Sequence, residues 1–191
     1  MLEMASMSGI DGHDGNRKLK ELLNIYAEIN DVSEDEIIEN FADKKRIELM
    51  SKKYSSVGFD YDGIKYADYI YNNGGINQIE WATKHLKEKE ETKSATIGLH
   101  IAGENKLTCL STIDFKIRDG RVIMNAVYRS QDIFNSLPGN YLALRKIQEH
   151  VARETGKATG ALNAIIFSAH IYEHNLEKVK SVLADMSRQK Q

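Results

Sequence analysis

The chain has 191 residues and a mass of 21.6 kDa, a length that favours one domain able to bury a core without disulfides or metals. Its net charge of −2 excludes a bulk electrostatic attraction to nucleic acid or to an anionic membrane, so an anionic ligand needs a local site. No apolar run is long enough to span a membrane, and the single cysteine, Cys109, excludes an internal disulfide and favours a reducing, cytoplasmic compartment.

The N-terminal third is predicted to be a leader followed by two helices. Residues 1–16 lack both the apolar region of a signal peptide and an Arg-rich pattern, so we expect a disordered or vector-derived leader. Residues 17–29 form a predicted helix because their apolar side chains recur at helical spacing, at Leu19, Leu22, Leu23, Tyr26 and Ile29. Ser33 and Glu36 form a capping box before "EIIENFADKKRIELMSKKY", which predicts a second helix.

The middle of the chain changes from helical to strand-like periodicity. Residues 55–75 are rich in Gly, Asp, Asn and Tyr and are expected to form a loop with short irregular pieces. Residues 76–92 predict a helix with an apolar face made by Ile76, Ile79, Ala82, Thr83 and Leu86. Three β-rich runs follow, "SATIGLHIAG", "LTCLSTIDFKIRDG" and "RVIMNAVYRSQD", and the turn at Asp119 and Gly120 predicts that the last two pair as an antiparallel hairpin.

The C-terminal part predicts helix, strand and helix. Residues 138–155 are helical, with Pro138 near the start and an interior face of Leu142, Leu144, Ile147 and Val151. Residues 161–172 read as a buried strand, and 173–189 as an amphipathic helix. No repeat or linker divides the chain, so residues 17–191 are predicted to be one α+β domain with helices against a mostly antiparallel sheet.

Five motifs follow one another in residues 76–191. A helix with a basic residue after it, Lys93, precedes Cys109, and the Asp119-Gly120 turn comes ten residues after the cysteine. An Arg-Ser-x-Asp signature then stands at 129–132, a Pro-x-Asn turn at 138–140 and an Ala-His-x-Tyr strand end at 169–172. In order and spacing they resemble the thymidylate synthase family, which includes the pyrimidine-nucleotide hydroxymethylases. The resemblance implies a thymidylate-synthase-like fold.

Cys109 is the nucleophile that the resemblance implies. A thiolate that adds to C6 of uracil makes C5 nucleophilic toward a one-carbon donor, and a nearby cation such as Arg129 would make the thiol more acidic. The alternative is a thiol packed in a half-buried strand.

The resemblance assigns Arg129 and Ser130 to the substrate phosphate, because a guanidinium binds phosphate bidentately and a hydroxyl adds a donor. The alternative for Arg129 is an ordinary surface arginine. Asp132 would hold the base region or an ordered water, or serve only as a turn aspartate.

Asn140 would read the pyrimidine, because its carboxamide complements O4 and N3–H of uracil. Family members that act on cytosine tend to have aspartate there. The alternative is a helix-capping asparagine. His170 and Tyr172, two apart on a strand, share a face and would hold the sugar 3′-hydroxyl, although a lone buried histidine is more often structural.

Three further roles rest on the resemblance alone. Tyr66, or Tyr69 in its place, would serve in proton removal from C5, and Glu21 would order water for the one-carbon step. Lys93 would reach the phosphate of the neighbouring subunit, which implies a homodimer formed through the sheet. No metal ligands are expected.

The sequence also departs from the family pattern. Residues 1–20 have no counterpart of the Arg-Thr-Gly phosphate loop, Leu110 replaces the usual histidine, and Ser168 replaces an aspartate. Lys93-Ser94 stands where the family has two arginines. We expect the C-terminal segment that caps the folate to be lacking, because few residues follow the last predicted helix. These differences indicate a divergent, shortened member.

The expected function is C5 transfer of a methyl or hydroxymethyl group to a pyrimidine nucleoside monophosphate, with dUMP as the expected substrate. The donor would be methylenetetrahydrofolate or a related pterin. The alternative is a non-catalytic or regulatory nucleotide-binding protein that kept the pocket and lost the folate site. Neither reading involves nucleic acid or a membrane.

Overall fold

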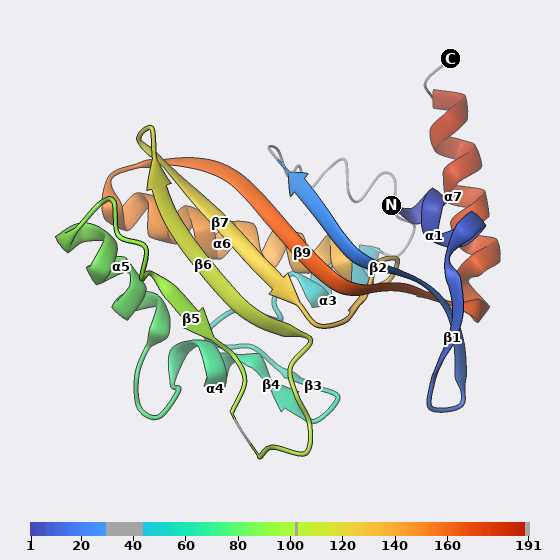
Figure 1. The fold of residues 1–191 in the computed structure, drawn as a ribbon, viewed down its shortest axis with the longest axis horizontal. Coiled ribbons are helices and arrows are strands. Elements are labelled where there is room, and N and C mark those ends of the chain that lie inside the picture. Colours follow the sequence, from blue (N-terminus) through green and yellow to red (C-terminus); the bar gives the residue numbers. More distant parts are fainter. Residues whose placement is uncertain (30–43, 102, 190–191) are drawn as a thin grey trace.

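The computed structural model describes residues 1–29, 44–101 and 103–189. Its central element is a seven-stranded sheet (Figure 1). The strand order is β1-β2-β9-β7-β6-β5, with β8 also paired to β9. All pairs are antiparallel except β7–β9 and β8–β9. The strands are β1 (Ile10–Asp14), β2 (Arg17–Ile29), β5 (Thr96–Gly98), β6 (Leu110–Arg118), β7 (Arg121–Tyr128), β8 (Gln131–Asp132) and β9 (Ala158–Tyr172), and a separate hairpin pairs β3 (Asp60–Tyr61) with β4 (Ile64–Lys65).

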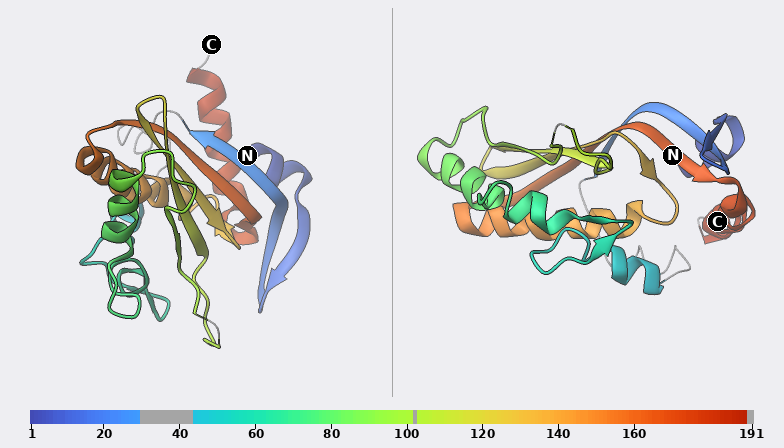
Figure 2. Two further views of the ribbon diagram at one scale, coloured as in Figure 1. Left: turned by 60° about the vertical axis from the view of Figure 1, so that its left-hand side comes forward. Right: turned by 90° about the horizontal axis from the view of Figure 1, so that it is seen from below.

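The described helices leave one face of the sheet uncovered. Four of them lie on the other face (Figure 2), namely α3 (Lys44–Met50), α4 (Tyr66–Tyr71), α5 (Gln78–Glu88) and α6 (Leu137–Thr155). The remaining two, α1 (Leu2–Ser8) and α7 (Leu176–Gln189), pack together at the β1 end of the sheet. The core lies between the sheet and the helices α4, α5 and α6. The predicted α+β class with a mostly antiparallel sheet is confirmed. No helix in the described ranges combines the length and the apolar character needed to cross a membrane.

Helix α6 begins and ends as its sequence predicts. Pro138 stands in the first turn, Gly156 closes the helix in the left-handed conformation at φ 68°, and the four predicted interior residues are buried. Gly139 allows α3 to pack directly against α6, because a Cβ there would lie 2.4 Å from the Met50 Cβ and 2.8 Å from the Ile47 carbonyl oxygen. This close packing sets the position of the segment that follows α3.

The β6–β7 hairpin and the later elements also agree with the sequence. Asp119 and Gly120 both have positive φ, at 50° and 69°, as a tight two-residue hairpin turn requires. Helix α5 is confirmed, with the Asn77 side chain accepting the amides of Ile79 and Glu80, but Ile76 is exposed rather than part of the apolar face. The predicted strand and final helix correspond to β9 and α7.

Two predictions for the N-terminal part are wrong. Residues 17–29 form strand β2, not a helix, because β2 pairs with β1 on one side and with β9 on the other, and this pairing outweighs helix-like spacing. The disorder expected for residues 1–16 is also wrong, since α1 buries Ala5 and β1 pairs with β2 along its length.

The second predicted helix is described only at its end, as α3. Its capping residues Ser33 and Glu36 lie outside the described residues. The loop predicted for residues 55–75 contains the β3–β4 hairpin and the short helix α4, which buries Tyr66.

Candidate active site

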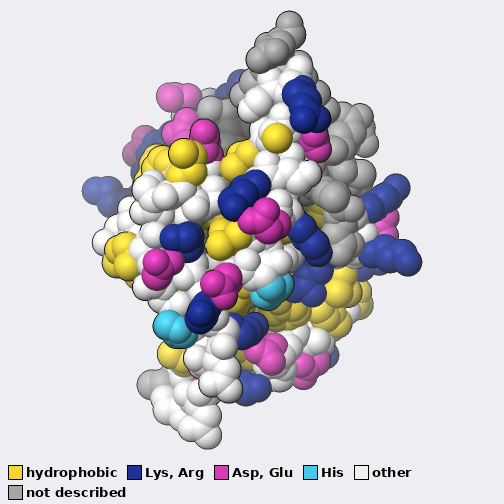
Figure 3. Space-filling view, turned by 90° about the vertical axis from the view of Figure 1, so that its right-hand side faces the viewer, with side chains coloured by type: hydrophobic (Ala, Val, Ile, Leu, Met, Phe, Trp, Pro, Cys, Tyr) yellow, Lys and Arg dark blue, Asp and Glu magenta, His cyan; other side chains and the backbone are white. Residues whose placement is uncertain are grey.

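A cavity of about 660 Å³ lies where β2, β8 and β9 meet the β1–β2 turn and the segment after α3. Basic, acidic and histidine side chains mix on the face of the molecule that carries β1 and α7 (Figure 3). The cavity is lined by His13, Asp14, Arg17, Leu19, Glu21, Arg46, Lys53, Tyr61, Asp62, Cys109, Arg129, Ser130, Gln131, Asp132, Asn135, Ser136, Ser168, His170, Tyr172 and His174. Seven of the predicted site residues are among them: Glu21, Cys109, Arg129, Ser130, Asp132, His170 and Tyr172.

Cys109 is half-buried and stands immediately before β6. Its backbone N–H donates to the Tyr66 hydroxyl oxygen at 2.9 Å, and its carbonyl accepts the backbone N–H of Arg129 at 2.9 Å. These two contacts fix the backbone on both sides of a residue that lines the cavity. The position therefore suits a nucleophile.

Tyr66 lies behind Cys109 and is almost fully buried. Burial, reinforced by the nearby Cys109, raises the pKa of its hydroxyl far above the ordinary value, so the hydroxyl remains protonated. The alternative residue, Tyr69, donates to the Glu104 carboxylate at 2.8 Å and does not line this cavity. Of the two tyrosines, only Tyr66 contacts the cysteine.

Arg129 uses part of its guanidinium to hold the loop before Cys109. Its Nε donates to the Thr108 carbonyl at 3.0 Å and its Nη2 to the Leu107 carbonyl at 2.9 Å. The next residue, Ser130, places its hydroxyl 3.4 Å from Nδ1 of His170. Arg129 and Ser130 both line the cavity, as a phosphate site requires, but Arg129 also has a structural task.

His170 and Tyr172 share one face of β9, with ring centroids 5.0 Å apart in an edge-to-face arrangement. Burial lowers the pKa of His170, against the opposing influence of Asp132, so the imidazole is neutral at neutral pH. The Tyr172 hydroxyl donates to the Asp14 carboxylate at 2.8 Å, and burial together with this bond raises the pKa of Tyr172.

The two carboxylates predicted for the site are both engaged. Asp132 accepts the backbone amides of Phe134 and Asn135, at 3.1 and 2.9 Å, which is the geometry of a turn aspartate. Glu21 pairs in register with His170 and accepts the Ser168 hydroxyl at 2.6 Å. Both residues line the cavity, where they could also contact a ligand, and the ligand-binding role of each stays a prediction.

Asn140 is fully buried inside α6 and is not the helix cap, because its backbone N–H donates to the carbonyl of Ser136, the residue that precedes the helix. Its Nδ2 donates to Oε1 of Gln131 at 3.1 Å, while its Oδ1 has no hydrogen-bond partner among the described residues. Gln131 lines the cavity, so Asn140 stands directly behind that wall.

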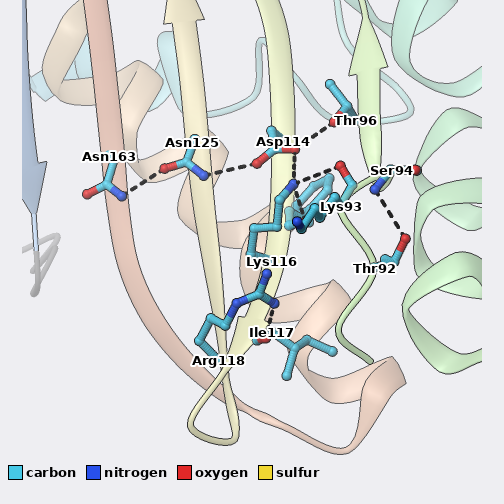
Figure 4. Close-up of polar contacts among 11 residues, drawn as sticks. Thr92, Lys93, Ser94, Thr96, Asp114, Lys116, Ile117, Arg118, Asn125 and Asn163 are labelled. Atoms are coloured by element: carbon cyan, nitrogen blue, oxygen red, sulfur yellow. Dashed lines mark hydrogen bonds and ion pairs between the residues drawn. The ribbon is translucent and has the colours of Figure 1, made fainter. Parts of the chain in front are cut away.

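Lys93 is not brought to the cavity within one chain. It lies in the segment before β5, where its backbone carbonyl accepts Lys116 Nζ at 3.3 Å (Figure 4). Nearby, a row of polar side chains crosses the uncovered face of the sheet through hydrogen bonds that join Thr96, Asp114, Asn125 and Asn163.

Apart from Glu21, the sequence interpretation missed the cavity residues that precede position 66. Asp14 and Arg17 come from the hairpin assigned to the leader and to a helix, Lys53 comes from the end of the predicted second helix, and Tyr61 comes from the expected loop. The Asp-Gly-Asn sequence at 14–16 was a usable signal, because Gly15 has a positive φ of 59° in the tight turn that it predicts.

Comparison with known proteins places the chain. The family model described as "Thymidylate synthase" matches residues 15–191. Proteins named "putative thymidylate synthase" from Methanococcoides burtonii and Methanosarcina mazei are each 29% identical, over 87% of this chain and 80% of their own length. A protein of the same name from Methanothermobacter thermautotrophicus is 32% identical over 73% of this chain and 64% of its own. The chain belongs to the thymidylate synthase family of one-carbon transferases.

Proposed function

We propose that the protein transfers a methyl or hydroxymethyl group to C5 of a pyrimidine nucleoside monophosphate, dUMP, through a covalent bond between Cys109 and C6. One observation carries this proposal: Cys109 lines the same cavity of about 660 Å³ as two arginines suited to a phosphate, Arg17 and Arg129. A cavity of this size lies within the range of small-molecule sites.

The phosphate is held by cationic and hydroxyl side chains that line the cavity. Arg129 and Ser130 offer a guanidinium edge and a hydroxyl, as a phosphate prefers, and Arg17 approaches from the β1–β2 turn. Arg17 lies over the Tyr172 ring at 4.3 Å, so the phosphate and sugar contacts adjoin. The neutral imidazole of His170 and the Tyr172 hydroxyl can exchange hydrogen bonds with a sugar hydroxyl.

The base is read by Asn140 together with Gln131. The unpartnered Oδ1 of Asn140 can accept N3–H of uracil once Gln131, which now separates it from the cavity, makes room for the base edge.

The chemistry begins when the thiolate of Cys109 adds to C6. The electron pair of the C5–C6 double bond moves toward the C4 carbonyl, and C5 would then take the one-carbon unit, whose bonds to the donor nitrogens would break with their electron pairs left on the donor. A hydride from the donor would complete a methyl group, and water would complete a hydroxymethyl group. The C5 proton leaves, and the sulfur–C6 bond breaks as the double bond forms again. Tyr66, whose protonated hydroxyl contacts the Cys109 amide, can relay that proton, and Glu21 can order the water that receives it.

The donor is methylenetetrahydrofolate or a related pterin, which supplies the one-carbon unit and, for methylation, a hydride. Asp62 on the cavity wall would hold its ring, because a carboxylate can accept the N–H groups of an aminopterin.

The active form is a homodimer that pairs the uncovered face of the sheet. Tyr26 and Ile165 pair in register there, and with Phe167 they expose large apolar side chains. Lys93 lies toward the β5 edge of the sheet, from which it would reach the phosphate in the partner subunit.

The test is covalent capture of the nucleotide. We expect incubation with 5-fluoro-dUMP and methylenetetrahydrofolate to add the mass of both molecules to the wild-type chain, as read by intact mass. Cys109→Ser should form no adduct and lose turnover, while its dUMP affinity stays within about tenfold, because the thiolate acts on the reaction more than on binding. Retained dUMP binding without any wild-type adduct would instead favour the non-catalytic nucleotide-binding protein.

A further inference from the structure

Lys53 is a buried cation enclosed by tyrosine rings. Its side chain is 2% exposed, and its Nζ lies 4.1, 4.6 and 5.7 Å from the ring centroids of Tyr61, Tyr66 and Tyr54. The open side of this cage faces the cavity that Cys109 also lines. Within the described residues, no carboxylate forms an ion pair with Lys53, although Asp62 lines the same cavity.

A buried ammonium without an anionic partner is costly, and aromatic faces offset only part of that cost. Burial lowers the pKa of Lys53 to about 8, the attraction of Cys109 opposes this effect, and the positive charge of Arg46 adds to it. Burial also raises the pKa of Tyr54 and Tyr66, so their hydroxyls carry no charge at neutral pH. Cys109, as a thiolate, is therefore the group that can balance the charge of Lys53.

Tyr66 connects the two residues. Its ring lies 4.6 Å from Lys53 Nζ, and its hydroxyl oxygen accepts the Cys109 backbone N–H at 2.9 Å. Arg129, the cation that the sequence suggested for this task, directs Nε and Nη2 to backbone carbonyls of the preceding loop. Lys53 is thus placed beside the cysteine without a competing acceptor among the described residues.

We propose that Lys53 supplies the positive charge that holds Cys109 in its thiolate form. When the thiolate forms, the S–H proton passes to water, Lys53 keeps its own proton, and no bond to Lys53 is made. The inference rests on the proposed function only in taking Cys109 as the nucleophile. Lys53 acts through Cys109 and needs no contact with the substrate.

The test measures thiol reactivity without any substrate. Cys109 is the only cysteine, so intact mass reports its alkylation by iodoacetamide directly, across a series from about pH 6 to pH 9. Lys53→Met should slow alkylation at neutral pH by about tenfold and move the rate profile to higher pH by about one unit. Lys53→Arg, which keeps the charge, should stay within about threefold of wild type. Lys52→Met is the matched control, because Lys52 is the exposed neighbour in sequence, and should change nothing.

A wild-type profile in Lys53→Met, with the fold intact by circular dichroism, would overturn the proposal. If that variant does not fold, Lys53→Gln provides a second neutral side chain for the same comparison. A merely structural Lys53 would leave the pH profile in place, whereas a charge-supplying one must shift it. Failure of 5-fluoro-dUMP capture with a shifted alkylation profile would reject the proposed reaction and leave the Lys53 inference standing.

Discussion

The Tyr172 hydroxyl donates a 2.8 Å hydrogen bond to the Asp14 carboxylate, joining the end of β9 to the end of β1. Arg17 ion-pairs with the same carboxylate and stands over the Tyr172 ring at 4.3 Å. Because all three residues line the cavity, the β1–β2 turn forms part of its wall. The N-terminal segment thereby contributes to the site as well as to the sheet.

Tyr172→Phe should lower the free energy of unfolding by about 0.5–1.5 kcal/mol, the usual net contribution of one hydrogen bond. It should also speed tryptic cleavage after Arg17 or Lys18, because the turn loses its anchor to β9. Urea unfolding and timed proteolysis measure the two effects. Tyr26→Phe is the control, since the Tyr26 side chain is largely exposed. Equal results for the two variants would mean that the Asp14 contact does not hold the turn.

Arg129→Ala should weaken binding of dUMP by roughly 2–4 kcal/mol and affect deoxyuridine much less, because only dUMP carries the phosphate. The loss of the bonds to the Leu107 and Thr108 carbonyls should also lower the free energy of unfolding. Calorimetry with both ligands separates these effects. Equal affinity losses for dUMP and deoxyuridine would leave Arg129 with its structural task alone.

His170 should make the fold sensitive to mild acid. Burial lowers its pKa, while in the unfolded chain it takes up a proton near its ordinary pKa of about 6.5. The unfolded state therefore binds more protons below that pH, and the free energy of unfolding falls as the pH drops through 6.5. His170→Gln should flatten this dependence, and His100→Gln, at an exposed position, should not. Urea unfolding between about pH 7.5 and 5.5 measures the dependence of the free energy of unfolding on pH. The same dependence in wild type and in His170→Gln would show that His170 is not its source.

Lys53→Met should stabilise the fold while it impairs thiol reactivity. The pKa of Lys53 is about 8 in the folded state and 10.5 in the unfolded chain, so the buried charge destabilises the wild type at neutral pH. The unfolded state binds more protons between these two values, so the free energy of unfolding of the wild type rises as the pH rises from 8 to 10.5. The variant should be more stable at neutral pH by about 1–3 kcal/mol and lose that rise. Urea unfolding at neutral pH and near pH 9.5 tests both. If Lys53→Met is less stable than wild type at neutral pH, the contacts of Lys53 with the tyrosine rings more than offset the cost of burying its charge.

The sequence predicted best where local and long-range forces agree. In α6, the early proline, the closing glycine and the interior face all favour the same helix, and in the β6–β7 hairpin Asp119 and Gly120 supply the positive φ values that the turn needs. The helix predicted for residues 17–29 was wrong because the segment pairs with two other strands, and this pairing outweighs its helix-like spacing. The sequence of the segment itself does not show which strands will lie beside it.

The candidate site was predictable only where motifs mark it. Cys109, Arg129, Ser130, His170 and Tyr172 come together at one end of the sheet because β6, β7 and β9 are neighbouring strands and β8 pairs with β9. Lys53 reaches the same cavity from the segment after α3 without any motif of its own, and Asp14 reaches it from the end of β1, where only the Asp-Gly-Asn turn sequence marks the hairpin. The placement of Lys53 depends on the close contact of α3 with Gly139, which is a property of tertiary packing.

Asn140 is the position at which the base should be chosen. Its Nδ2 is engaged by Gln131, which leaves Oδ1 as an acceptor suited to N3–H of uracil. Cytosine has no hydrogen on N3, so it would leave that buried acceptor unsatisfied at a cost of about 1–3 kcal/mol. Wild type should therefore prefer dUMP to dCMP by roughly tenfold to a hundredfold.

Asn140→Asp should move this preference toward cytosine. A carboxylate accepts from the exocyclic amine of cytosine, and in its protonated form it also donates to N3, whereas against uracil it meets the acceptor O4. The Gln131 amide can rotate to present its donor to the new carboxylate, so the wall behind the cavity should stay intact. Calorimetric dissociation constants of dUMP and dCMP for the two proteins provide the measurement, with Asn135→Asp, at an asparagine that lines the cavity, as the control for added charge. If the ratio of the two constants is the same in wild type and Asn140→Asp, the buried amide serves the packing of α6 and does not read the base.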